Sequence, residues 1–169
     1  MLDQHDTGPL KELREKLHTL HEKARAGTLS AEERPFYERT RDDLARMLLF
    51  AQQMTRAPGQ KFRAALRVRT ELDVAIALPS DETRAKTINL SVGGFAAELA
   101  TAPSVGAKAR VKLSLADGYV VEGDAAVVAV NPVGDKARVS FAFQALSERD
   151  QERVTVGVFD CVLPELAKL

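Results

Sequence analysis

The hydrophobic period of the sequence changes at Pro58-Gly59, and this change limits the possible folds more than any other feature. Before it, apolar residues recur every three or four positions, which is typical of helices. After it, apolar and polar residues alternate through most of the chain, which is typical of β-strands with one buried face. The sequence therefore predicts two domains, a helical one at residues 1–57 and a β-rich one at residues 58–169.

The helical domain is predicted to be two helices joined by a short turn. The first covers Leu10–Ala24, where Leu10, Leu13, Leu17, Leu20 and Ala24 are spaced by three and four, as in helices that pack on another helix. Gly27 suits the position directly after a helix, where the backbone often adopts the left-handed conformation. Ser30-Ala31-Glu32-Glu33 has the S-x-x-E form of a capping box and starts a second helix, which ends at Ala57-Pro58-Gly59. The expected product is an antiparallel helical hairpin.

The second helix has more apolar side chains than one partner helix can cover. Its stripe consists of Phe36 or Tyr37, Thr40, Leu44, Met47, Ala51 and Met54, and Leu48, Leu49 and Phe50 widen it. Such a surface either docks on the chain's own second domain or binds another chain. Because the heptad spacing is kept over the first helix, we expect a homo-oligomer through the N-terminal helices, and a protein partner whose identity the sequence does not reveal.

The second domain is predicted to be a barrel, because six runs alternate in hydrophobicity between turn signals. The first run is one long strand, Arg67–Leu78. The others are Thr83–Leu90, Phe95–Leu99, Ala107–Leu115, Tyr119–Val130 and Lys136–Phe143, with turns at Pro79-Ser80-Asp81, Pro103-Ser104, Asp117-Gly118 and Asn131-Pro132-Val133-Gly134. Six antiparallel strands of this length favour a closed or nearly closed barrel.

A short C-terminal helix should follow the last strand. Ser147-Glu148-Arg149-Asp150 resembles a second capping box, and the helix would carry Val154, Val158 and Val162 on one side. That side can plug or flank the barrel. The expected fold class is therefore α+β: an N-terminal antiparallel helical hairpin, a six-stranded antiparallel β-barrel and a C-terminal helix.

Charge and cysteine content exclude several classes of function. Lys plus Arg and Asp plus Glu each number 24, so no overall positive field holds the chain on nucleic acid. Cys161 is the only cysteine, which excludes an intramolecular disulfide. His18 and His21 are predicted on a solvated helix face, and we expect no metal site. No apolar run approaches the roughly 20 residues of a membrane span, so we expect a cytoplasmic protein without membrane insertion.

No catalytic constellation is recognisable in the sequence. It has no glycine-rich phosphate loop before a helix and no nucleophile elbow. We therefore expect a protein that is not an enzyme and that has neither catalytic residues nor a cofactor.

A local anion site is indicated at the start of the β-rich domain. Within 56–69 five cations occur without a carboxylate: Arg56, Lys61, Arg63, Arg67 and Arg69. Arg63 and Arg67 are four residues apart, so both guanidinium groups can lie on one side of the chain. Guanidinium groups bind phosphate oxygens, grip the O6/N7 edge of guanine, or stack on a purine. The segment could equally be a basic linker.

The second candidate feature is Asn89-Leu90-Ser91-Val92-Gly93-Gly94, between two predicted strands. Asn89 and Ser91 would point to one side of an extended chain. Gly93 and Gly94 would allow positive φ and the close approach of a flat ring. Alone, this segment could be an ordinary tight turn.

Together, Arg63-x-x-x-Arg67 and Asn89-x-Ser91-x-x-Gly94 resemble the paired RxxxR and (D/N)xSxxG signatures of PilZ domains. The resemblance covers roughly Lys61–Phe159. It implies that cyclic di-GMP is the ligand, bound as a regulatory signal and not turned over. It further implies that Arg63 and Arg67 hold phosphates and guanine, that Asn89 and Ser91 meet a guanine edge and a nearby phosphate, and that Gly94 provides clearance. Arg69 is included as a further candidate.

Two positions depart from the family pattern. Many members have an arginine where Phe62 stands, which helps them bind an intercalated ligand dimer, and the last strand commonly has glycine at the position of Ser140. Two hypotheses follow. In the first, the chain is a cyclic di-GMP effector whose ligand changes partner binding or self-association. In the second, it is a PilZ-like scaffold that binds no ligand and acts through its hairpin.

Overall fold

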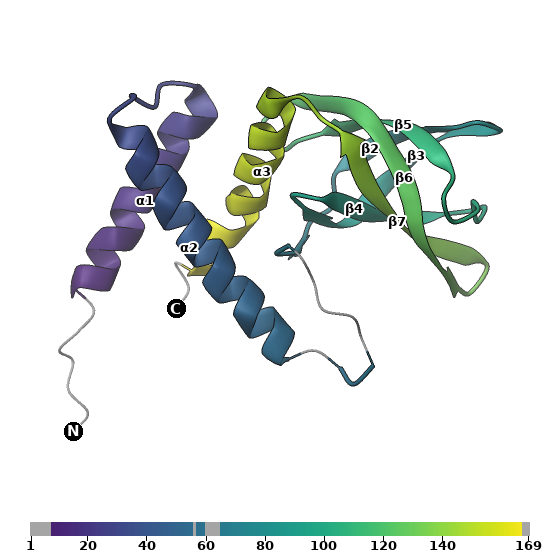
Figure 1. The fold of residues 1–169 in the computed structure, drawn as a ribbon, viewed down its shortest axis with the longest axis horizontal. Coiled ribbons are helices and arrows are strands. Elements are labelled where there is room, and N and C mark those ends of the chain that lie inside the picture. Colours follow the sequence, from purple (N-terminus) through teal and green to yellow (C-terminus); the bar gives the residue numbers. More distant parts are fainter. Residues whose placement is uncertain (1–7, 56, 60–64, 167–169) are drawn as a thin grey trace. The chain divides into compact units, whose positions relative to one another are not determined.

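The computed structural model describes residues 8–55, 57–59 and 65–166. The chain forms two compact units, Met1–Arg63 with Val162–Leu169, and Ala64–Cys161. The first contains the helices α1 (Gly8–Ala26) and α2 (Glu33–Met54), drawn in purple and blue in Figure 1. The second contains the strands. The α+β fold with a helical hairpin, a closed six-stranded barrel and a C-terminal helix is confirmed.

Both predicted signals at the helical turn are present. The Gly27 N–H bonds to the Ala24 carbonyl oxygen at 3.2 Å and the Thr28 N–H to the Lys23 carbonyl oxygen at 2.9 Å, with Gly27 at φ 74°. This is the Schellman arrangement that ends helices. In the capping box, the Ser30 Oγ accepts from the Glu33 N–H at 3.1 Å, and a Glu33 carboxylate oxygen accepts from the Ser30 N–H at 3.2 Å.

The hairpin has a small buried core. Leu17, Leu20 and Tyr37 form it, and Ala24, Leu29, Leu44 and Leu163 pack against it. The prediction that His21 lies on a solvated face is wrong: His21 is 2% exposed, and its Nδ1 lies 2.8 Å from the Tyr37 hydroxyl. The tyrosine hydroxyl gives the imidazole a polar partner, which allows it to be buried.

The apolar stripe predicted on the second helix is buried only in part. Tyr37 of α2 is buried whereas Phe36 is 37% exposed. Beyond Leu44, Met47, Phe50 and Met54 are 70%, 67% and 72% exposed, so Met47 and Met54 do not pack in the hairpin as expected. These three residues, spaced by three and four on one side of α2, are named the α2 apolar face here.

The barrel is closed by six strands. They are β2 (Asp73–Leu78), β3 (Asp81–Ser91), β4 (Gly94–Leu99), β5 (Lys108–Ser114), β6 (Val120–Val133) and β7 (Lys136–Ala145). Each pairs antiparallel with the next in the order β3-β2-β5-β6-β7-β4, and a β3–β4 pairing closes the ring. Figure 1 shows the strong curvature of β6 and β7. Closure leaves these strands without a free edge along most of their length.

The predicted long first strand is in fact two strands separated by a break. β1 (Val68–Arg69) pairs with the end of β3, and β2 pairs with its beginning. At the break, the buried Thr87 hydroxyl donates to the Thr70 carbonyl oxygen at 2.6 Å and accepts from the Leu72 N–H at 2.9 Å. A side chain of β3 thus replaces part of the backbone ladder.

The chain turns between the last two strands later than predicted. β6 continues through Asn131 and Pro132 to Val133, where a turn was expected, and the reversal occurs at Gly134-Asp135. Gly134 has φ 62°. A two-residue hairpin turn of type II′ requires such a positive φ at its first residue.

The barrel interior is filled by inward side chains of alternate strand residues. Ile76, Val111, Leu113, Val121 and Val139 have no exposed surface. The C-terminal helix α3 (Glu148–Leu166) is longer than expected, and its Ser147 Oγ accepts from the Asp150 N–H at 3.1 Å. Its buried residues include the predicted Val154, Val158 and Val162. Among the described residues, no helix is long and apolar enough to cross a membrane.

Candidate functional site

The register of five strands assembles the motif residues on the outer side of the barrel. Directly opposed residues of antiparallel strands point to the same side. Arg69 of β1 opposes Asn89 of β3, which opposes Ala96 of β4, which opposes Ser140 of β7. The sequence neighbours Leu90 and Phe95 are 0% and 3% exposed and face the core, so this row faces outward.

A parallel row lies next to the first. Ser91 of β3 opposes Gly94 of β4, which opposes Ala142 of β7, which opposes Ala126 of β6. The two rows place Arg69, Asn89 and Ser91 at one end and small residues beyond them. We name Gly94, Ala96, Ser140 and Ala142 the small-residue floor; each is buried or half-buried.

Two of the predicted binding residues have side chains ready for a ligand. Arg69 is exposed and Asn89 is half-buried, and neither side chain has a hydrogen-bond or ion-pair partner among the residues that the structure describes. A half-buried amide without a partner is unfavourable unless water or a ligand completes its hydrogen bonds. Asn89 can both donate and accept, as recognition of a guanine edge requires.

The remaining polar motif residues are placed as follows. The half-buried Ser91 hydroxyl donates to the Gly94 carbonyl oxygen at 3.3 Å, a long bond that leaves its lone pairs available. Arg67 is exposed and directly precedes β1. Arg63, Lys61 and Phe62 lie outside the described residues, so the predicted RxxxR motif is described at its second arginine only.

Gly94 is required by strand packing, and the expected positive φ is wrong for both glycines of the motif. A Cβ added to Gly94 would lie 2.0 Å from the Phe141 carbonyl oxygen and 3.1 Å from the Ala142 Cα, both in β7. At Gly93 the nearest atom would be the Ser91 Oγ at 4.0 Å. The clearance that Gly94 provides is therefore for the backbone of β7, which the sequence did not indicate.

Several parts of this site were missed at the sequence level. Thr87, which ties the backbone next to Arg69 to β3, looked like an ordinary inward strand residue. The small-residue floor combines residues of β4 and β7 that are more than forty positions apart in the sequence. The signal that could have revealed it is the repeated Gly, Ala or Ser at alternate positions of both strands.

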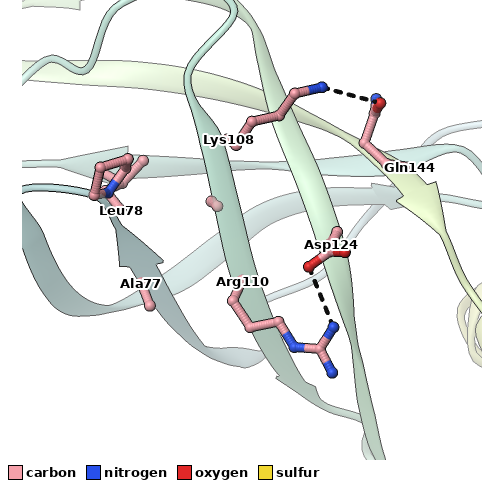
Figure 2. A pocket seen from close by; sticks show the side chains of 8 residues that line it. Ala77, Leu78, Lys108, Arg110, Asp124 and Gln144 are labelled. Carbon is pink, nitrogen blue, oxygen red and sulfur yellow. Dashed lines mark hydrogen bonds and ion pairs between the residues drawn. The ribbon is translucent and has the colours of Figure 1, made fainter.

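A pocket on the barrel wall adjoins the far end of the second row, because its Lys108 opposes Ala126 (Figure 2). It has a volume of about 500 Å³ and is lined by Ala77, Leu78, Pro79, Lys108, Ala109, Arg110, Asp124 and Gln144. Its charged groups are engaged with one another: Lys108 Nζ lies 3.4 Å from Gln144 Oε1, and Arg110 Nη1 lies 3.2 Å from Asp124 Oδ1. This pocket therefore has few polar groups left for a ligand.

Other chemistry is poorly supported by the described residues. They contain no group of three or more His, Cys, Asp or Glu side chains that could hold a metal ion. Burial raises the pKa of the Cys161 thiol, which disfavours the reactive thiolate. Tyr119 donates to Asp150 Oδ1 at 2.6 Å, and this bond raises the pKa of its hydroxyl.

Comparison with known proteins identifies the barrel. Residues 61–160 match the model of the PilZ domain family. No curated protein matches the sequence. Among solved structures, the Bacillus subtilis inhibitor of motility MotI/DgrA aligns with 24% identity and a TM-score of 0.54 over 65% of this chain and 54% of its own.

Two further solved structures have the same fold. The PilZ domain of Escherichia coli YcgR with c-di-GMP aligns with 19% identity and a TM-score of 0.53, over 64% of this chain and 97% of that domain. The K. pneumonia MrkH–c-di-GMP complex aligns with 20% identity and a TM-score of 0.55, over 65% and 56%. This chain thus spans about half of MotI/DgrA and of MrkH.

Proposed function

This chain belongs to the PilZ domain family, and we propose that it is a cyclic di-GMP receptor that acts as an effector without catalysing a reaction. The observation that carries the proposal is the outward row in which Arg69 and Asn89 border the small-residue floor. Two of the aligned structures, of YcgR and MrkH, contain c-di-GMP, which supports the same ligand here.

The chemistry of the row suits a ligand with two guanines and two phosphates. The Asn89 side-chain oxygen can accept hydrogen bonds from guanine N1 and N2, and its nitrogen can donate. Arg63, Arg67 and Arg69 supply forked cations for phosphate oxygens or for the O6/N7 edge. The small-residue floor carries no long side chain of its own, and Gly94 and Ala96 in it are buried.

The segment that carries the arginines is the proposed moving part. Two hydrogen bonds from the Thr87 hydroxyl fix the backbone at Thr70 and Leu72, just after Arg69. In this proposal, ligand binding clamps the segment from Arg56 to Arg69 onto the barrel and so changes the direction of the hairpin. In this proposal, residues 58–169 receive the signal and residues 1–57 transmit it in the cytoplasm.

The proposed output is a change of self-association through the α2 apolar face. Met47, Phe50 and Met54 expose most of their surface, and clustered exposed apolar side chains are typical of interaction surfaces. A second copy of the chain can cover this face with the same residues, as in symmetric dimers.

Isothermal titration with cyclic di-GMP tests the ligand proposal, with GTP and cyclic AMP as controls. We expect Arg63→Ala and Arg67→Ala each to lose roughly ten- to a hundredfold in affinity, the value of a charge-assisted contact. Arg84→Ala is the matched control, because Arg84 is an exposed β3 cation that opposes Ala75 of β2, away from the two rows.

The alternative is a PilZ-like scaffold that binds no ligand and acts through its hairpin. Folded wild-type protein that gives no heat with cyclic di-GMP at hundreds of micromolar would favour this alternative and end the receptor proposal. Asn89 argues against it, because within the described residues its side-chain amide has no partner and is available to a ligand.

A further inference from the structure

Arg138 lies on the outer side of the barrel, one row beyond the small-residue floor. On β7 it is two residues from Ser140, so both side chains point outward. It opposes Glu98 of β4 and Asn131 of β6. Arg138 therefore borders the floor on the side away from Arg69.

Arg138 as a residue is half-buried, and its side chain has no hydrogen-bond or ion-pair partner in the part of the chain that the structure describes. Its cross-strand neighbour Glu98 is instead paired with Lys136, whose Nζ lies 3.5 Å from Glu98 Oε1. Two other outward cations of the barrel do have partners: Arg110 pairs with Asp124 and Glu122, and Lys86 with Asp73.

A guanidinium group without a counter-charge keeps all of its N–H donors available for an anion, and a phosphate or a guanine edge can accept two of them at once. The neighbouring floor and Asn89 are the surfaces to which we assign the guanine ligand. Arg138 is the unpaired cation that borders them on β7.

We propose that Arg138 is a further ligand-binding residue, which holds a phosphate or the O6/N7 edge of a guanine at the end of the floor opposite Arg69. This inference rests on the cyclic di-GMP site proposed above. From Arg69 to Ser140 there are three strand spacings, roughly 14 Å across the sheet. Arginine side chains that lean inward from both ends can therefore contact one extended dinucleotide.

The test is titration of Arg138→Ala and Arg138→Lys with cyclic di-GMP, next to the wild type. We expect Arg138→Ala to lose about tenfold in affinity, as for one charge-assisted contact. We expect Arg138→Lys to recover only part of the loss, because lysine keeps the charge and lacks the fork. The dependence of affinity on salt should weaken in Arg138→Ala, since one ionic contact is removed.

Arg84→Ala is again the control, because Arg84 is an exposed cation of β3 away from the two rows, and it should bind like the wild type. Equal melting temperatures of the variants would show that the fold is unchanged. If the wild type binds and Arg138→Ala binds equally well, the role of Arg138 is wrong while the receptor proposal stands. If the wild type itself does not bind, the receptor proposal fails first.

Discussion

The barrel and the helical hairpin differ in how completely each covers its own apolar residues. In the barrel, inward residues such as Ile76 and Val139 have no exposed surface. In the described part of the hairpin, three buried apolar side chains make the core. Phe50 of the α2 apolar face is 67% exposed. The barrel thus covers most of its own apolar residues, and the function that we propose for it uses polar groups on its outer side. The hairpin instead leaves apolar surface exposed on α2.

The largest expected effect on the barrel comes from Gly94→Ala. The new Cβ would meet the Phe141 carbonyl oxygen at 2.0 Å, so β4 and β7 must separate. We expect a loss of about 3 kcal/mol in the free energy of unfolding, the upper end for overpacking. Urea unfolding followed by circular dichroism measures it, which suits a chain that has no tryptophan.

Gly93→Ala is the matched control in the same motif. Its Cβ has open space apart from the Ser91 Oγ at 4.0 Å, and Gly93 has no positive φ. The free energy of unfolding should stay within about 0.5 kcal/mol of the wild type. Equal stability of Gly93→Ala and Gly94→Ala would contradict the packing role of Gly94.

These two glycines also show where sequence reasoning stops. The motif could be found in the sequence, but the contact that distinguishes its glycines comes from β7, almost fifty residues later. The six strands and the capping box of α2 were predictable because alternation and capping are local patterns. The break between β1 and β2 was not, because alternation continues through it and Thr87 causes it from another strand.

The hairpin shows the same limit. Heptad spacing predicted that α1 packs on a partner helix, and Leu17 and Leu20 do so. The spacing could not show that His21 is buried, because its burial depends on the Tyr37 hydroxyl of the other helix. Nor could it show where burial on α2 ends, since that depends on how many residues α1 can cover.

A smaller loss is expected from Thr87→Val, which keeps the shape of the side chain. The valine leaves the Thr70 carbonyl and the Leu72 N–H without their hydroxyl partner. We expect a loss of about 2 kcal/mol in the free energy of unfolding. Titration of the variant should also show weaker binding of cyclic di-GMP, because Arg69 is in the adjoining strand.

Thr83→Val is the control for this change. Thr83 is also a β3 residue that opposes a buried residue of β2, Ile76, and its hydroxyl has no hydrogen-bond partner among the described residues. Its replacement should be close to neutral. If both variants lose the same stability, the hydroxyl bonds of Thr87 are not what fixes the break.

In the hairpin, Ser30→Ala should cost about 1 kcal/mol in the free energy of unfolding, because it removes the cap of the Glu33 N–H. Lys23 Nζ lies 2.6 Å from Glu33 Oε2. This contact and the hydrogen bonds with Ser30 lower the pKa of the Glu33 carboxyl below its ordinary value of 4.5. A carboxyl group whose pKa is lowered in the folded protein stabilises the fold above about pH 4.5. This contribution is lost as the pH falls through the pKa of the folded state.

Glu33→Gln separates the two effects of this residue. Glutamine can keep the reciprocal bond to the Ser30 N–H but has no charge to titrate. Thermal unfolding at several pH values should show less acid destabilisation in this variant than in the wild type. An unchanged acid profile would mean that the Lys23 contact does not stabilise the hairpin.

The smallest effect on stability is expected for the double change Met47→Gln and Phe50→Gln, which removes exposed apolar surface from the hairpin. Both residues are largely exposed, so the free energy of unfolding of a single chain should change by less than about 0.5 kcal/mol. If the α2 apolar face joins two copies, light scattering should show a dimer for the wild type and a monomer for the variant.

Val105→Gln with Val128→Gln, which alters two exposed valines of the barrel, is the control and should leave the mass unchanged. A change at Leu17 is unsuitable for this test, because Leu17 is 4% exposed within the hairpin core and its loss would unfold the helices. Wild-type protein that is a monomer at tens of micromolar, with and without cyclic di-GMP, would rule out self-association as the output.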